Sequence, residues 1–146
     1  MTFVIPSDAN QCVKLIQKSV DHSGPMCIRI ARGAEPLVYT EDYEYEIGKA
    51  IVAHEGNDVT VVAAGCTVAF AVSAANALEK EGIGVRVLDM HTIKPLDGEL
   101  VLKAGAGDRG LVTTGGGQPW WAAWARRWRS SWPSTTRCRW CATAST

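Results

Sequence analysis

The chain has no excess of charge, because its 15 basic and 15 acidic residues cancel. We therefore expect no specific nucleic-acid partner and no attraction to an anionic membrane. It also lacks an apolar run of the roughly 18 residues that a membrane span needs, and residues 1–8 lack the basic start and cleavage site of a signal peptide. These absences predict a cytoplasmic protein. Its 146 residues, 47% of them apolar, suffice for one domain with a hydrophobic core.

Cysteine shows none of the regular spacing of a disulfide framework. The set is odd in number, and its first three members lie among apolar residues, which predicts buried, reduced thiols: Cys12, Cys27, Cys66, Cys138 and Cys141. Cys138 and Cys141 have the spacing of half a zinc site or of a redox pair. No second pair or nearby histidine completes such a site, so we predict no metal ligands in this chain.

The first third of the chain alternates as strand, helix and strand. An apolar run over 3–5 is followed by Ser7 and Asp8, either of which can cap a helix. Apolar residues then recur at spacings of three and four, which predicts one buried helix face: Ala9, Cys12, Val13, Ile16 and Val20. A second strand is predicted over 26–30, and the segment 35–46 has no sustained period, which is typical of a linker.

A second series of elements begins near residue 47. The run 58–65 is almost continuously β-forming, as expected for a strand buried on both faces of a parallel sheet. Thr67 can cap the helix that follows, and further strands are predicted at 85–89 and 110–113. A short helix between those two strands carries Leu100, Val101 and Ala104. Strands that alternate with helices predict an α/β fold with a parallel sheet and right-handed crossovers.

Five segments, in the same order, resemble transketolase, and above all its separate C-terminal subunit in organisms where the enzyme is split into two chains. They are PSDAN at 6–10, GP with IRIAR at 24–32, YEIGKAI at 45–51, EGNDVTV at 55–61 and VLDMHTIKPLD at 87–97. The resemblance covers about residues 2–114. It implies a parallel-sheet, three-layer C-terminal domain over 47–114, a linker over 35–46, and over 1–34 the last strand, helix and strand of a pyrimidine-binding domain.

The same resemblance implies a thiamine-diphosphate enzyme of the pentose phosphate pathway. Such an enzyme moves a two-carbon ketol unit between sugar phosphates, with Mg²⁺ holding the diphosphate. The implied partners are an N-terminal transketolase subunit or domain and a homodimer-type assembly. No residue of this sequence matches the family's activating glutamate, its substrate-binding histidines or its metal site, so no catalytic, cofactor-binding or metal residue is assigned.

Arg32 is the one site residue that the resemblance supplies, because it matches the arginine that grips the sugar phosphate. A guanidinium offers a planar fork to phosphate oxygens, although an arginine at a strand end can equally be a solvated or salt-bridged residue. Arg29 is predicted to pair with a carboxylate, His91 to have a packing role, and His22 and His54 to be exposed. The glycines at 115–117 lack the spacing and the lysine of a phosphate loop.

Residues 115–146 contain no Val, Leu, Ile, Asp, Glu or Lys, and all six tryptophans lie between Trp120 and Trp140. Because tryptophan has the single codon TGG, a shifted frame turns this stretch into Val-Gly-Gly-Leu-Gly, a glycine turn suited to the family's next segment. We therefore predict a frameshifted tail. Losing the helix and strand of the true frame should leave an exposed apolar patch and an open sheet edge.

Three functions are compatible with these patterns. The leading hypothesis is a C-terminal part of a transketolase that is inactive as an isolated chain. A second is the C-terminal region of a 2-oxoacid dehydrogenase beta subunit or of a deoxyxylulose-phosphate synthase, but segments 90–97 and 29–32 favour transketolase. A third is a noncatalytic interaction module with a genuine basic tail, which requires the present frame to be the true one.

Overall fold

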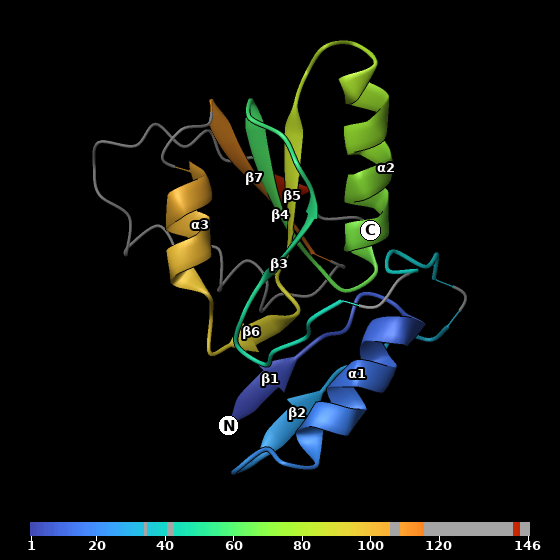
Figure 1. Cartoon of the computed structure of the whole chain (residues 1–146), viewed down its shortest axis with the longest axis vertical. Helices are drawn as coiled ribbons and strands as arrows, with labels where there is room; N and C mark the ends of the chain where they lie inside the picture. Colours follow the sequence, from blue (N-terminus) through green and yellow to red (C-terminus); the bar gives the residue numbers. More distant parts are fainter. Residues whose placement is uncertain (34, 41–42, 106–108, 116–141, 144–146) are drawn as a thin grey trace.

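The computed structural model describes residues 1–33, 35–40, 43–105, 109–115 and 142–143 (Figure 1). Its elements follow one another as β1 (Thr2–Val4), α1 (Ala9–Ser19), β2 (Met26–Ile28), β3 (Ile51–His54), β4 (Val59–Ala64), α2 (Thr67–Glu79), β5 (Val85–Asp89), β6 (Thr92–Lys94), α3 (Gly98–Gly105), β7 (Gly110–Gly115) and β8 (Ala142–Thr143). Among the described residues, no helix has both the length and the apolar character to cross a bilayer. Most of the predicted tail, with its tryptophans and Cys138 and Cys141, lies outside the described residues.

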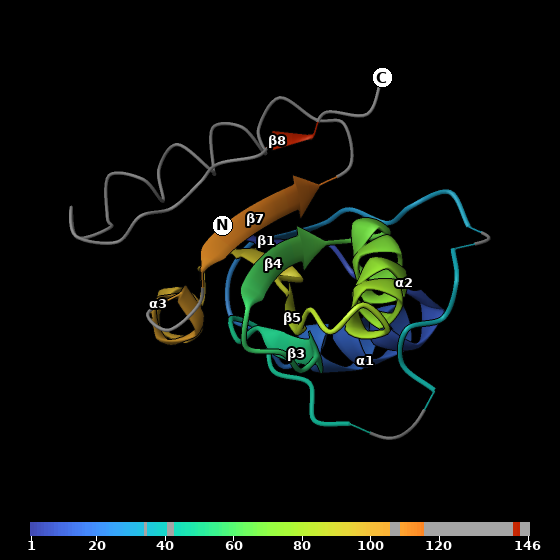
Figure 2. The ribbon, with the colours of Figure 1, turned by 90° about the horizontal axis from the view of Figure 1, so that it is seen from above.

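Five strands form the main sheet, in the order β3-β5-β4-β7-β8. The strand β4 is parallel to both of its neighbours, β5 and β7, so the predicted parallel α/β core is confirmed. Figure 2 shows α2 on one face of this sheet and α3 on the other, which gives three layers. The predicted open edge at β7 is partly covered, because β8 pairs with Thr113 and Thr114.

The sheet is mixed rather than wholly parallel, because β3 runs antiparallel to β5. The sequence prediction assigned no strand to this segment. The chain arrives at β3 from the smaller sheet and then turns directly into β4, so β3 runs opposite to the central strands. An edge strand of four residues with mixed burial, such as β3, gives a weak sequence signal.

The central strands bury side chains on both faces, as the continuous apolar run predicted. Val62 and Ala64 belong to the cluster under α3, whereas Ala63 packs with Val68 and Ala75 of α2. The predicted cap of α2 is wrong by one residue. Cys66 occupies the N-cap position without a side-chain cap bond, and the neighbouring Thr67 donates its hydroxyl to the Ala64 carbonyl at 2.9 Å.

A second, three-stranded sheet has the order β2-β1-β6. The strands β1 and β2 are parallel, as expected for a strand-helix-strand unit, and β6 joins β1 from the other side in the antiparallel direction. The sequence prediction did not include β6. Its pairing, extended by the hydrogen bond from Ile5 N–H to the His91 carbonyl at 2.7 Å, fastens the N-terminal unit to the C-terminal one.

The predicted buried face of α1 is wrong. Val13 is 58% exposed, Ile16 47% and Val20 81%, whereas Gln11 and Leu15 are buried completely. The side that packs inward is the one that carries Gln11, because this amide reaches a buried carboxylate described below. The predicted burial of the thiols is also wrong within the described residues: Cys27 is exposed, and Cys12 and Cys66 are partly exposed.

Candidate functional site

A groove of about 490 Å³ lies where β1 and β2 end. The two strands are parallel, with Val4 opposite Ile28, so their carboxyl ends meet at one edge of the sheet. The groove is lined by the residues that follow each strand, including Ser7 and Asp8 after β1 and Ile30 and Gly33 after β2. Such an edge, next to a helix N-terminus, is a common place for ligands in α/β proteins.

Asp8 lines this groove at the N-terminus of α1. Its Oδ1 accepts the Gln11 N–H at 2.7 Å, so of the two predicted caps, Ser7 and Asp8, Asp8 is the N-cap of α1. Its Oδ2 accepts the N–H groups of Val38 and Tyr39 at 2.8 and 2.9 Å. One carboxylate therefore ties the linker to the helix. Because its negative charge already occupies the helix N-terminus, an anion in this groove would depend on other cations.

Arg32 lies at the exposed rim of this edge, between groove-lining residues Ala31 and Gly33. Arg32 is exposed, and a guanidinium carries five N–H donors. The predicted phosphate contact stays a prediction. The backbone of Arg29 extends the pairing beyond β2, because its N–H donates to the Val4 carbonyl at 2.9 Å.

A buried carboxylate, Asp89 at the end of β5, gathers three side chains behind the groove. Its Oδ2 accepts the Ser7 hydroxyl at 2.9 Å, the Gln11 amide at 2.8 Å and the Tyr39 hydroxyl at 2.8 Å. Among the described residues, Oδ1 has no hydrogen-bond partner. Burial, with a smaller contribution from the Asp8 carboxylate, raises the pKa of Asp89 to about 6 against the lowering effect of its three donors.

His91 is fully buried, in line with its predicted packing role. Its Nδ1 lies 3.1 Å from the Tyr45 hydroxyl and 3.0 Å from the Thr92 hydroxyl, and its ring stacks at a tilt on Tyr45 with centroids 4.4 Å apart. Burial lowers the pKa of His91 to about 4, so the imidazole is neutral at pH 7. His91 therefore contacts Tyr45 of the linker and Thr92 of β6 as an uncharged group.

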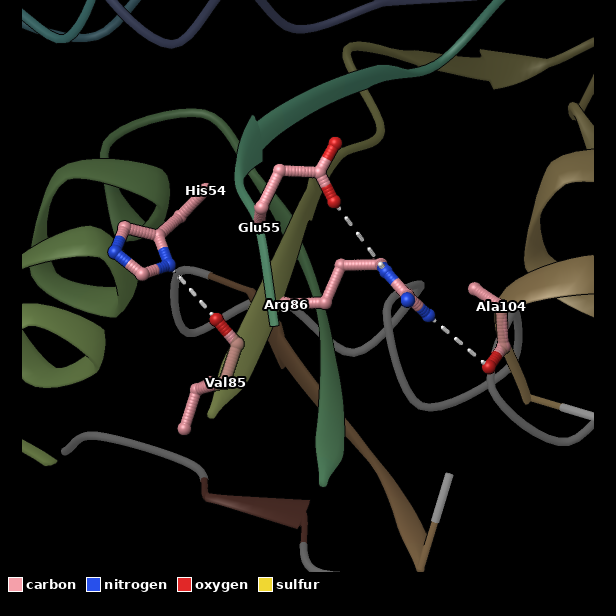
Figure 3. Close-up of polar contacts among 5 residues, drawn as sticks. All are labelled: His54, Glu55, Val85, Arg86 and Ala104. Carbon is pink, nitrogen blue, oxygen red and sulfur yellow. Dashed lines mark hydrogen bonds and ion pairs between the residues drawn. The ribbon is translucent and has the colours of Figure 1, made fainter. Parts of the chain in front are cut away.

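The predicted exposure of the other two histidines is wrong. His22 is partly buried and its Nε2 lies 3.1 Å from the Thr2 hydroxyl. Figure 3 shows His54 reaching the Val85 carbonyl at 2.8 Å, beside Arg86. Both histidines lie in polar, turn-like sequence, and each contacts a residue of another strand. These contacts join residues far apart in the chain, so the local sequence does not reveal them.

Figure 3 also shows how Arg86 links three elements. Its guanidinium donates to the Ala104 carbonyl at the end of α3, at 3.3 Å, and lies 3.9 Å from the Glu55 carboxylate. A cation near the C-terminus of α3 complements the helix dipole. These contacts hold α3 and the turn after β3 on the sheet and take no part in the groove.

Sequence analysis did not identify the group made by Asp89, Gln11 and Tyr39. Asp89 was included in a predicted strand, and one signal was available: a carboxylate interrupts an otherwise apolar run there. Its partners lie 78 and 50 residues away in sequence, so no spacing rule connects them. The described residues contain no cluster of three or more His, Cys, Asp or Glu side chains suited to a metal ion.

Comparison with known proteins gives matches to transketolases. Residues 48–119 match the family model "Transketolase, C-terminal domain". One subunit of the apulose-4-phosphate transketolase of Phocaeicola vulgatus is 44% identical over 115 residues, which are 78% of this chain and 36% of that protein. A 6-deoxy-6-sulfo-D-fructose transketolase subunit of a Clostridium species is 39% identical over 77% of this chain and 35% of the relative.

Among solved structures, a split-gene transketolase described as an inactive beta4 tetramer superimposes with a TM-score of 0.83. It is 32% identical in sequence, and the match covers 99% of this chain and 49% of that one. The present chain thus spans about a third of the length of the curated relatives it matches.

Proposed function

We propose that this chain, whose residues 48–119 belong to the transketolase C-terminal domain family, is the C-terminal part of a transketolase. Together with an N-terminal transketolase subunit, in a homodimer-type assembly, it would move a two-carbon ketol unit between sugar phosphates in the cytoplasm. As an isolated chain it would be inactive. The observation that carries this proposal is the 44% identity to a transketolase subunit over 115 residues, which far exceeds the likeness of a shared fold alone.

Within this proposal, residues 1–34 are the end of a pyrimidine-binding domain, 35–46 a linker and 47–114 the C-terminal domain. The unit β1-α1-β2 supports the first assignment, because two parallel strands joined by a helix are a portion of a larger α/β sheet. The exposed apolar residue Val20, at the end of α1, also fits a helix whose end packs against further protein.

Arg32 is proposed to bind the phosphate of the sugar substrate. Its exposed position at the carboxyl ends of two parallel strands supports this role, as does the match of the guanidinium fork to phosphate oxygens. The groove beside it supplies space for part of a sugar phosphate.

Thiamine diphosphate and Mg²⁺ would serve the complete enzyme, but the described residues of this chain do not fit them. Asp8 already accepts three backbone N–H groups, Asp89 is buried among side-chain donors, and no cluster of candidate metal ligands is present among the described residues. The contribution to the reaction that we propose for the described residues is therefore substrate binding by Arg32.

A chimera tests the proposal. Residues 1–114 would replace the matching segment of the Phocaeicola subunit, which is then combined with its N-terminal partner, thiamine diphosphate and Mg²⁺. We expect turnover of a ketose phosphate by the chimera and none by the 146-residue chain with the same partner. A folded chimera without activity would contradict the assignment, and turnover by the chain itself would contradict its inactivity.

The proposed role of Arg32 is tested in the same chimera. We expect Arg32→Gln to raise KM for the sugar phosphate at least tenfold, since a charge-assisted contact is worth about 1.5–3 kcal/mol. Arg109→Gln is the matched control, because Arg109 is 85% exposed and pairs with Asp58 on another part of the molecule. Equal KM values for the two variants would contradict the proposal that Arg32 binds the sugar phosphate.

We also propose that the tail after about residue 114 is a frameshifted product. The support is compositional: tryptophan, arginine and alanine replace the apolar and acidic residues of the preceding part. Resequencing the coding DNA from the Gly105 codon past Thr146 tests this. Loss of a one- or two-base insertion or deletion is the expected result, and an unchanged frame would favour the alternative of a genuine basic tail.

A further inference from the structure

Asp89 joins three separate parts of the chain through a single oxygen atom. Oδ2 accepts from Ser7 in the loop after β1, from Gln11 in α1 and from Tyr39 in the linker, all at 2.8–2.9 Å. Ser7 has one hydroxyl proton and also lies 3.1 Å from the Gln11 carbonyl oxygen, so this donor serves one acceptor at a time. The carboxyl is completely buried, and the described residues offer no partner to its Oδ1.

Tyr39 is the linker's contribution to this cluster and is held from several sides. Its N–H donates to Asp8 Oδ2 at 2.9 Å, and its carbonyl accepts the Asn10 side-chain amide. Its ring stacks on Tyr43 with centroids 4.3 Å apart. Lys14 in turn donates to the Tyr43 carbonyl and lies over that ring. The linker therefore lies along α1 and covers Asp89.

The groups that face Asp89 are acidic or uncharged. Asp8, at the start of α1, contributes a negative charge that raises the pKa of Asp89. From the linker come three tyrosines, Tyr39, Tyr43 and Tyr45, whose pKa values are all raised by burial and by the charge of Asp89. His91 follows β5 and is neutral at pH 7 because burial lowers its pKa to about 4. The one cation in contact with these tyrosines among the described residues is Lys14, whose Nζ lies 4.1 Å from the Tyr43 ring centroid.

We propose that docking of the linker onto α1 through Val38, Tyr39 and Tyr43 is proton-linked through Asp89: the docked linker takes up a proton at this carboxyl, and the undocked linker releases it to water. Lifting Tyr39 removes a hydrogen-bond donor, which by itself favours the neutral carboxyl, and it also opens the carboxyl to water, which favours the carboxylate. Burial has the larger effect on Asp89, so exposure to water decides the direction of the linkage. Glu35, at the start of the same linker, is one of the residues that line the groove. This device does not depend on the proposed enzymatic activity.

The sign follows from linkage. The docked carboxyl has a pKa of about 6, and a hydrated one returns toward its ordinary value of 3.8. Because the docked state binds the proton more tightly, acid favours docking and rising pH favours release. With these two pKa values, the equilibrium constant for release increases about tenfold between pH 5 and pH 7 and about fiftyfold between pH 4 and pH 7.

Hydrogen exchange of the Val38 and Tyr39 amides in the full chain measures this release, because both amides donate to Asp8 Oδ2. After division by the intrinsic exchange rate, we expect their opening constants to increase about tenfold from pH 5 to pH 7. Asp89→Asn should abolish this increase. Asp58→Asn is the matched control: Asp58 accepts the Gly84 N–H at 2.8 Å on another part of the sheet, and its replacement should leave the increase intact.

Two further measurements test the proposal even if the Asp89→Asn variant fails to fold. In the wild-type chain, the carbon-13 signal of the Asp89 carboxyl should titrate near pH 6. In Tyr39→Phe, the ionised carboxylate loses one donor, so the midpoint should move to higher pH. A midpoint near 3.8 in the wild type, or an undiminished pH dependence in Asp89→Asn, would overturn the proposal. It also fails if Val38 and Tyr39 exchange no faster than Val61 in the central strand, since the linker would then open only with the whole protein.

Discussion

The helices α1 and α2 each follow a strand that has a parallel neighbour, β1 and β4, yet they bury different kinds of side chain. α2 packs the apolar side chains of Val68 and Ala75 against the sheet. α1 buries Gln11 and Leu15 and leaves most of its apolar stripe in solvent. The difference shows that apolar periodicity identifies a helix but does not choose its inner side when a buried carboxylate needs a donor.

Among substitutions in the two regions, we expect the largest loss of unfolding free energy in the core of the main sheet. Leu88, fully buried in β5 between its neighbours on the sheet, belongs to the cluster under α3. We expect Leu88→Ala to lower the free energy of unfolding by about 4 kcal/mol, from lost burial and the cavity left behind. Phe70→Ala, at a 65% exposed position of α2, should change it by less than about 0.5 kcal/mol. Urea denaturation measures both, and similar losses would mean that Phe70 is covered.

Two adjacent residues of α1 test which side of this helix is packed. Leu15 and Ile16 are neighbours in sequence, but Leu15 is fully buried and Ile16 is 47% exposed. We expect Leu15→Ala to cost about 3 kcal/mol of unfolding free energy and Ile16→Ala less than about 1 kcal/mol. The same denaturation experiment checks this, and the reverse order would show that the predicted face of α1 is the packed one after all.

The buried polar groups give the N-terminal region its own pH dependence. Asp89 has its pKa raised from 3.8 to about 6, so its contribution to stability is present at low pH and is lost as pH rises through 6. His91 has its pKa lowered from 6.5 to about 4, so its contribution is present above 6.5 and is lost as pH falls through 4. Each amounts to about 3 kcal/mol, and the two nearly cancel between pH 4 and 6.5.

Single variants should separate these opposed contributions. In Asp89→Asn, stability should rise with pH across this window, because the histidine effect remains. In His91→Gln, it should fall with rising pH. Unfolding free energies at pH 4, 5, 6 and 7 test the pair, and parallel profiles for the two variants would contradict the assigned shifts.

A smaller effect should follow from removing the helix cap. Asp8→Ala leaves the N–H groups of Gln11, Val38 and Tyr39 without their acceptor. We expect a loss of about 1–2 kcal/mol. Asp8→Asn keeps a carbonyl acceptor for Gln11 and should lose less than half as much. Equal losses would indicate that the charge, rather than the cap bond, stabilises this end of α1.

Much of the fold was predictable from local sequence. The strands β4 and β5 and the helices α2 and α3 follow from apolar runs and helical spacing, and Asp8 was among the two predicted caps of α1. The strands β3 and β6 were missed, because each is short and is defined by its pairing with a distant strand. For the site, the sequence supplied Arg32 only through a family resemblance, and its phosphate contact stays a prediction.

By itself, the sequence determined the alternation of strands and helices, the doubly buried central strands and the likeness to transketolase, because these depend on residues close together in the chain. Only the tertiary structure decided which side of α1 is buried and that Ser7, Gln11 and Tyr39 meet at Asp89. Their partnership spans 50 to 82 residues. Burial, which gives that carboxylate its raised pKa, exists only once those segments have come together.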